Sequence, residues 1–394
     1  MVASTLRLAR LFLNPNPMAM KRIFLSLFTL VLATQLTPQN LMGADNALKA
    51  YLKNPKTGGL ELKGAGNLHA GTHGLLLVAE QGGSIVAIDT GDRGVFKPFK
   101  GTIKDIGKKV AGAIGAKSVN INDLAVNPET GTIYLSIRRS DGLTAVLTVD
   151  GNGKIDALDT DKVKWVRATL NEKLKISRIS DIGLAPGRLL VAGQSNDAFR
   201  SRIFSLALPL THGAAASTYS TDTYHVAHGR WETKAPIQSF ILYEEANTPY
   251  MVGSFACTPI AKFPLTNIKD GAKVTGTSVL ELGSGNRPLD MFTYSSGGKQ
   301  WLVTHTMRFH KPFTYTPSKY WAARIDMKHI AASTKDKTNE KAARRNKGVA
   351  QDPQGIEVVK ALHGAVQVDK YGDKQAAVLR EAEGNLNLEV VDLP

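Results

Sequence analysis

The stretch that decides the fold is NINDLAVNPETGTIYLSIRRSDGLTAVLTVDGNGKIDAL, residues 120–158. It starts with a short apolar segment and turns at NPETG (127–131), where Pro and Gly occupy positions that turns favour. Apolar and polar residues alternate in TIYLSI (132–137), and the apolar LTAVLTVD (143–150) follows a polar loop. A further turn leads into a fourth segment. Because alternation between turns is typical of β-strands, we predict a four-stranded antiparallel unit.

The same plan returns five more times along the chain. The other copies are residues 67–91, 178–208, 237–265, 287–309 completed by 322–327, and 365–393. A repeated four-stranded unit of this length is the signature of a β-propeller blade. Each blade leaves two apolar faces, which stacking around a ring buries. We therefore predict an all-β fold, a β-propeller with six blades.

Two structural alternatives stay open at this stage. A seventh blade is present if residues 91–119 contain a degenerate copy, and a two-domain β-sandwich would also use many short strands. We interpret residues 103–118 as a helix, because Ile106, Val110, Ala113 and Ile114 lie near one helical face. The composition, 43% hydrophobic with 36 glycines in 394 residues, suits a globular chain rich in turns.

The N-terminus has the features of a secretory signal. Lys21 and Arg22 precede the apolar run IFLSLFTLVLA (23–33), which is short for a membrane span. Met18 and Met20 lie just upstream, so translation can start at either of them. The protein is therefore expected to be secreted or periplasmic.

Two cleavage points fit this signal, after Ala33 and after Ala44, and we favour Ala44. Residues 1–44 are then the signal peptide and residues 45–394 a single propeller domain. An uncleaved membrane anchor is the alternative, and it is the only membrane contact that we expect. Cleavage removes four basic residues and no acidic one, so the net charge falls from +15 to +11. Such a charge favours anionic partners, whereas nucleic acid is not expected because no nucleic-acid motif is present.

Two further segments bear on function. A basic insertion is predicted at about 328–354, and its part 328–347 carries seven Lys or Arg against two acids. We interpret it as a solvated loop, with an anion-binding arm as the alternative. Cys257 is the single cysteine, so no internal disulfide can form, and we expect a buried small side chain rather than a reactive thiol.

Blade geometry predicts where the polar residues meet. In a propeller, the start of each first strand and the loop between the second and third strands open on the same face. Seven of the nine histidines fall in such segments: His69, His73, His225, His228, His305, His310 and His363. The predicted ligand-binding residues on this face are Arg138, Arg178, Arg200, His228, Arg230, Glu232, Arg287 and Arg308. Alternatively, polar side chains here bond to the backbone of the neighbouring blade and lock the ring.

A metal site is the second hypothesis for this face. Calcium prefers oxygen ligands, which could come from Asn122, Asp123, Asp181, Asn286 and Asp290. Copper or zinc would draw instead on His225, His228, His305, His310 and His363. The sequence lacks the CxxCH, HExxH, GxSxG and Walker motifs, which argues against c-type haem, zincin, α/β-hydrolase and P-loop chemistry.

Four phrases resemble those of an exported bacterial β-propeller family of unestablished activity within the quinoprotein/YVTN-like propeller superfamily. They are NDLAVNP (122–128), AHGRWETKAPI (227–237), FACTPIAKFPL (255–265) and GNRPLDM (285–291). The resemblance runs from about residue 74 to the C-terminus and implies a propeller fold and export. THTMRFHKPF (304–313) departs from the family pattern, which puts His305 and His310 in doubt as family-wide ligands.

Two functional hypotheses follow. The first is a binding or scaffold propeller, expected to be monomeric, whose basic face takes an anionic small molecule, a glycan or an envelope protein. The second is a calcium-dependent hydrolase or lyase, by analogy with calcium-holding six-bladed hydrolases. We favour binding, because arginines outnumber any clean set of metal ligands.

Overall fold

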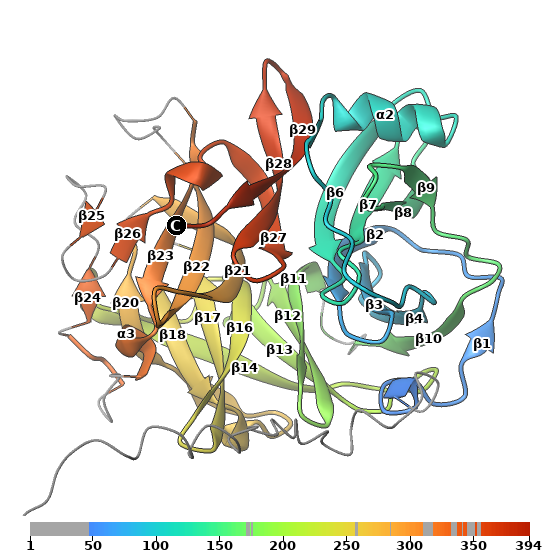
Figure 1. The fold of residues 1–394 in the computed structure, drawn as a ribbon. Coiled ribbons are helices and arrows are strands. Elements are labelled where there is room, and N and C mark those ends of the chain that lie inside the picture. The colour runs from blue at the N-terminus through green and yellow to red at the C-terminus, as the bar shows by residue number, and fades with distance from the viewer. Residues whose placement is uncertain are drawn as a thin grey trace, which may run out of the picture. The chain divides into compact units, whose positions relative to one another are not determined.

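Six antiparallel sheets follow one another along the chain, one for each of the six repeats (Figure 1). The structure is a computed structural model that describes residues 47–394, except 171–173, 175, 257–258, 284, 310–317, 332–336, 341, 345–350 and 353–355. All described residues belong to one compact unit. The prediction of a six-bladed, all-β propeller is therefore confirmed.

The first three blades are named here in chain order, each from its innermost strand outward. Blade 1 contains β2 (Ala65–Ala70), β3 (Leu75–Glu80), β4 (Ser84–Asp89) and β10 (Lys164–Thr169), with β1 (Lys56–Thr57) at its edge. Blade 2 contains β6 (Val119–Val126), β7 (Ile133–Arg139), β8 (Thr144–Val149) and β9 (Ile155–Ala157). Blade 3 contains β11 (Ile176–Ala185), β12 (Arg188–Ser195), β13 (Ser201–Ala207) and β14 (Ser217–His225), with β15 (Arg230–Glu232) and β19 (Lys273–Thr275) beside β14.

The remaining blades follow the same plan. Blade 4 contains β16 (Ile237–Glu245), β17 (Thr248–Phe255), β18 (Pro259–Pro264) and β20 (Thr277–Glu281), with β24 (Ala343–Arg344) at its edge. Blade 5 contains β21 (Asn286–Ser296), β22 (Lys299–Arg308), β23 (Tyr320–Asp326) and β26 (Ile356–Val358), with β25 (Gln351–Asp352) outermost. Blade 6 contains β27 (Ala365–Tyr371), β28 (Gln375–Ala382), β29 (Asn385–Asp392) and β5 (Thr102–Ile103).

The turn between β6 and β7 shows how the sequence forms these hairpins. The Asn127 side-chain oxygen accepts the backbone N–H of Glu129 at 2.9 Å, an Asx-turn contact. Gly131 closes the turn with a φ of 77°, a conformation in which a side chain would be strained. Its N–H donates to the Asn127 carbonyl. The NPETG stretch therefore reverses the chain as the sequence predicts.

The blades do not follow one another around the ring in chain order. Six clusters of buried apolar side chains lie between blades, and each cluster joins one pair. The pairs are blades 1 and 2, 1 and 3, 3 and 4, 4 and 5, 5 and 6, and 2 and 6. Around the ring the order is therefore 2, 1, 3, 4, 5, 6. Each sheet has apolar side chains on both faces because it is packed between two others.

Two blades take their fourth strand from a distant part of the chain. The chain leaves blade 2 and returns to blade 1, where β10 pairs antiparallel with β4 before blade 3 begins. The two-residue strand β5 pairs antiparallel with β29 and so joins residues 102–103 to the C-terminal blade. These long-range pairings close the ring, because each ties a sheet to a segment more than 70 residues away.

The predicted helix is present where a seventh blade was the alternative. Helix α2 (Ile106–Ala113) buries Ile106 and Val110, two of the residues expected on its inner face. It contacts β6, β9 and β29, so it lies over the junction of blades 2 and 6 (Figure 1). Within the described part of the chain, no helix has the length and apolar character needed to cross a bilayer.

Some predictions fall on segments outside the described residues. These are the signal peptide at 1–44, Cys257, His310 and much of the basic insertion. The described parts of the insertion include the short helix α3 (Lys328–Ala331) and the short strands β24 and β25. Export and cleavage stay predictions.

Candidate functional site

Two cavities lie along the axis of the ring, where the innermost strand of each blade faces the centre. The first, the shaft cavity, has a volume of about 350 Å³ and is lined by all six innermost strands, β2, β6, β11, β16, β21 and β27. The second, the mouth cavity, measures about 620 Å³ and lies toward the starts of these strands. Asn67 and Asp290 line both cavities, so the two are adjacent.

Four of the six innermost strands carry an aspartate that bonds to the next strand around the shaft. Each carboxylate accepts a backbone N–H from the neighbouring blade. The pairs are Asp123 with the N–H of Leu68 (2.7 Å), Asp181 with Phe240 (2.7 Å), Asp290 with Val368 (3.2 Å) and Asp369 with Val126 (2.8 Å). The ring-locking alternative considered for the polar side chains of this face is thus present in the contacts of Asp123, Asp181 and Asp290. Adjacent blades cannot form a backbone ladder at the axis, so these side chains satisfy N–H groups that would otherwise be buried without a partner.

Burial makes these carboxylates weak acids. It raises the pKa of Asp181 and of Asp369 to about 7 in each case. The pKa of Asp123 is raised well above its ordinary value, first by burial and then by the nearby charge of Asp290. Burial also lowers the pKa of His69 to about 4. Near neutral pH the shaft therefore holds fewer charges than its composition suggests, because desolvation disfavours charged forms.

Asp290 is held by a histidine from the next strand of its own blade. His305 is fully buried, and its Nδ1 lies 2.9 Å from Asp290 Oδ2. Its Nε2 lies 2.7 Å from the carbonyl oxygen of Ala365. Because a carbonyl can only accept, Nε2 carries a proton and donates to blade 6. The imidazole therefore fixes the carboxylate that lines both cavities.

Arg178 is the cation of the mouth cavity. Its side chain is exposed and lines the cavity. Desolvation by nearby protein atoms and then the charge of Arg287 lower the pKa of Arg178, while Asp123 and Asp290 act in the opposite direction. Within the described residues, no carboxylate forms a salt bridge with Arg178. Arg287 donates through Nε to Gln238 Oε1 at 3.1 Å.

Three amide side chains line the mouth cavity beside Arg178. The nitrogen of Asn67 donates to the Ser180 carbonyl (3.2 Å), that of Asn122 to Ala65 (2.9 Å) and that of Gln367 to Asn122 (3.3 Å). Each bond reaches the neighbouring blade and fixes the amide. No donor from the described residues contacts the three amide oxygens, so they are acceptors available to a ligand.

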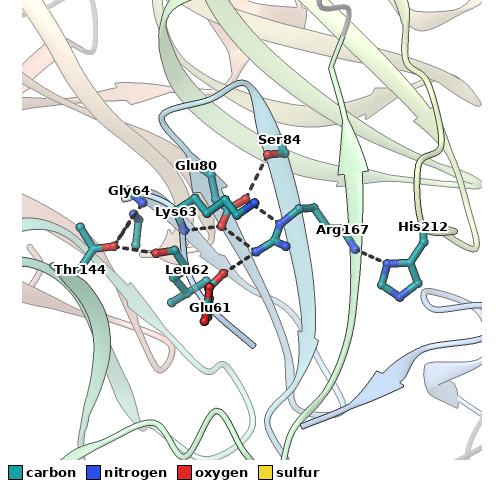
Figure 2. A network of polar contacts seen from close by, with 10 residues as sticks. Glu61, Leu62, Lys63, Gly64, Glu80, Ser84, Thr144, Arg167 and His212 are labelled. Carbon is teal, nitrogen blue, oxygen red and sulfur yellow. Dashed lines mark hydrogen bonds and ion pairs between the residues drawn. The ribbon is translucent and has the colours of Figure 1, made fainter. Parts of the chain in front are cut away.

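Glu80, which lines the mouth cavity, forms an ion pair with Arg167. Figure 2 shows this pair and the polar contacts around it. The Glu80 side chain is fully buried, and Arg167 Nε and Nη2 donate to its two oxygens at 2.8 and 3.0 Å. Lys63 N–H and the Ser84 hydroxyl donate to the same carboxylate at 2.7 and 3.0 Å. Arg167 Nη2 also reaches the Glu61 carbonyl. Since four donors saturate Glu80, its role is to hold β10 against blade 1.

The structure brings together only part of the predicted ligand-binding set. Arg178 lines the mouth cavity, and Arg287 is near enough for its charge to lower the pKa of Arg178. Arg138 lies one residue before the end of β7, Arg200 precedes β13 and Arg308 ends β22; none of the three lines the cavity. His228, Arg230 and Glu232 lie at the β14–β15 hairpin on the outer edge of blade 3. Their roles in binding stay predictions.

The predicted calcium ligands are also divided. Asp123, Asp181 and Asp290 line the shaft, but their carboxylate oxygens are not within 4.8 Å of one another as a group. Asn122 lies at the mouth, whereas Asn286 is buried in blade 5. Its nitrogen donates to the Gly283 carbonyl at 2.8 Å and its oxygen accepts from the indole N–H of Trp321 at 3.0 Å. Calcium binding stays a prediction that the geometry does not support.

The prediction that seven histidines gather at one mouth is wrong for five of the described ones: His69, His73, His225, His228 and His305. His69 lies in the shaft, and His305 is enclosed within blade 5. His73 occupies the turn after β2, at the opposite end of the ring, with a φ of 60° and Glu129 beside it. His225 and His228 lie at the outer edge of blade 3. The prediction failed because it placed every histidine near the innermost strand of a blade equally close to the axis of the ring.

Two important residues were missed. Asp369 stands in VQVDKY at the place that Asp123 occupies in INDLAV, so comparison of the first strands could have identified it. Arg167 had no comparable signal, because its strand belongs to a blade that begins about 100 residues earlier.

Comparisons with known proteins complete the description. No protein-family model matches the sequence, and no curated protein sequence matches it either. Similar solved structures include an α-L-arabinofuranosidase from Lactobacillus brevis, with 10% identity, coverage of 68% of this chain and 92% of that one, and a TM-score of 0.33. A GH43 endo-arabinanase from Bacillus licheniformis is 14% identical, with coverage of 69% of this chain and 93% of that one, and a TM-score of 0.34. A protein from Thermus thermophilus, named provisionally as an oxidoreductase (glucose dehydrogenase), is 13% identical. The match covers 86% of this chain and 99% of that one, with a TM-score of 0.32. These values are too low to assign a family or an activity.

Proposed function

We propose that the chain binds a small, hydroxyl-rich anion, of the kind represented by acidic sugars, in the mouth cavity. The observation that carries the proposal is Arg178, an exposed cation that lines a cavity of about 620 Å³. No described carboxylate forms a salt bridge with it. An anionic group would supply a partner, because a guanidinium forms strong, charge-assisted hydrogen bonds with carboxylates.

The rest of the cavity wall favours hydroxyl groups. The amide oxygens of Asn67, Asn122 and Gln367 and the carboxylate of Asp290 accept hydrogen bonds, and a sugar hydroxyl donates them. Their positions are fixed by bonds to neighbouring blades. A ligand would therefore meet a preorganised site and lose little free energy in ordering it.

A second candidate function is hydrolysis. It is favoured by Asp181 and Asp369, whose pKa of about 7 would let either side chain donate a proton at neutral pH. Both carboxyls also accept backbone N–H bonds on each oxygen, which is the arrangement of a structural residue. Binding therefore has the stronger support.

Calorimetric titration with D-galacturonate, and with D-galactose as its uncharged counterpart, tests the proposal. We expect galacturonate to bind the wild type more tightly, and Arg178→Gln to weaken it about 10- to 100-fold, given about 1.5–3 kcal/mol for a charged hydrogen bond. Arg138→Gln is the matched control, because Arg138 is exposed near the same end of the ring but outside the cavity. Equal binding of both sugars, or equal loss in both variants, would contradict the proposal. Release of free sugar from a galacturonide chain would favour hydrolysis.

A further inference from the structure

A second group of polar side chains lies at the outer edge of blade 3, remote from the axis. Strand β14 ends at His225, the chain turns through His228, and β15 brings Glu232 back alongside. The ligand atoms of these three residues lie within 4.8 Å of one another, and they form the only such group found in the described part of the chain. We call them the His–Glu cluster.

The distances between ligand atoms in the His–Glu cluster are close to those between the ligands of one zinc ion. Glu232 Oε1 lies 2.6 Å from His228 Nδ1 and 3.6 Å from His225 Nδ1. The two imidazole rings are 3.9 Å apart between centroids. Tetrahedral zinc with bonds of about 2.0–2.1 Å places its ligand atoms about 3.3 Å apart. Small side-chain movements would therefore bring all three atoms to zinc distance.

A further carboxylate stands behind the buried histidine. His225 is only 2% exposed, and its Nε2 lies 3.6 Å from Glu281 Oε1 at the end of β20 in blade 4. The N–H of Ala227 donates to the same oxygen at 3.1 Å and holds it in place. Metal-binding histidines usually donate their second N–H to such a carboxylate, which fixes the ring and raises its basicity. Nδ1 of His225 is then the atom that faces the cluster.

We propose that His225, His228 and Glu232 bind one zinc ion, with Glu281 orienting the His225 ring. Two imidazoles and one carboxylate are a donor set that zinc accepts, and they leave a fourth position open. His228 lies at the surface with 41% of its side chain exposed, so water can reach that position. The ion would displace the proton between His228 and Glu232 and tie the β14–β15 hairpin toward blade 4.

Arg230 competes with the ion. Its Nε lies 3.3 Å from Glu232 Oε1, while 71% of its side chain is exposed. The guanidinium can therefore move into solvent when a metal binds. Its positive charge beside the cluster opposes a divalent cation, so its removal should increase zinc affinity.

Titration of chelator-treated protein with ZnCl₂, followed by elemental analysis after dialysis, tests the proposal. We expect one zinc per chain for the wild type and none retained by His228→Ala. Glu281→Gln should bind zinc about 10- to 100-fold more weakly, as expected for loss of a carboxylate behind a ligand. His73→Ala is the matched control, because His73 also lies beside a single carboxylate, Glu129, but outside the cluster.

Two further measurements separate a lost site from a lost fold. Arg230→Gln leaves all ligands in place and should bind zinc more tightly than the wild type. CoCl₂ should give the visible absorption of tetrahedral cobalt in the wild type and in His73→Ala, but not in His228→Ala. Absence of bound zinc in the wild type, or retention of one zinc and the cobalt spectrum by His228→Ala, would overturn the proposal.

Discussion

Replacement of Glu80 by glutamine tests how blade 1 is closed. The Glu80 side chain is fully buried, and the Arg167 side chain that it binds is 21% exposed (Figure 2). Removing one partner of a buried ion pair typically costs about 3–5 kcal/mol, because the other charge stays buried. Partial hydration of Arg167 reduces this cost, so we expect Glu80→Gln to lower the free energy of unfolding by about 2–4 kcal/mol.

The assay is equilibrium unfolding in urea, with Arg167→Gln and the double variant completing a double-mutant cycle. We expect a coupling energy of about 2 kcal/mol between the two positions, since the contact is bidentate. Arg139→Gln is the control, because its pair with Asp141 is exposed by 29% and 49% and should contribute less than about 1 kcal/mol. Additive effects at positions 80 and 167, or equal losses in Glu80→Gln and the control, would refute the reasoning.

Two other predictions concern the shaft and the core. Asp181 and Asp369, each with a pKa of about 7, stabilise the fold fully below about pH 4, and this stability is lost as the pH rises toward 7. His69, with a pKa of about 4, makes the fold more stable as the pH rises to about 6.5. Comparing the wild type with Asp181→Asn cancels this contribution, because both proteins keep His69. Between pH 4.5 and 6.5, the free energy of unfolding in urea should fall by about 2 kcal/mol less in Asp181→Asn than in the wild type. An identical fall in both proteins would contradict this reading. Gly276→Ala would place a methyl group 2.5 Å from ring atoms of the buried Phe263 and should cost about 1–3 kcal/mol, measured by the same assay; an unchanged midpoint would show that the ring can move aside.

The blades could be read directly from the sequence because their information is local. Alternating apolar residues and turn chemistry, as in NPETG at 127–131, specify a hairpin within about ten residues of chain. The positions of all six copies, and the helix that interrupts them at 106–113, are found where the pattern predicts them. The resemblance to an exported family stays a prediction, since the described residues establish the propeller fold but not the family.

The candidate site could be predicted from the sequence only in part. Asp123, Asp181 and Asp290 stand at matching places in their strands, which marked them as equivalent before their partners were known. Whether an equivalent residue binds a ligand or a neighbouring backbone depends on what lies across the shaft. The arginines were grouped by face, but of the predicted arginines only Arg178 lines the mouth cavity at the axis.

The sequence by itself determined the strand unit, its sixfold repetition and the all-β class, because hydrophobic alternation and turns act over short distances. Only the tertiary structure decided the ring order 2, 1, 3, 4, 5, 6 and the return of β10 to blade 1. It also decided which polar residues became neighbours, such as Glu281 of blade 4 beside His225 of blade 3. The physical reason is that packing between blades joins surfaces far apart in the chain, and every blade offers much the same apolar face to any neighbour.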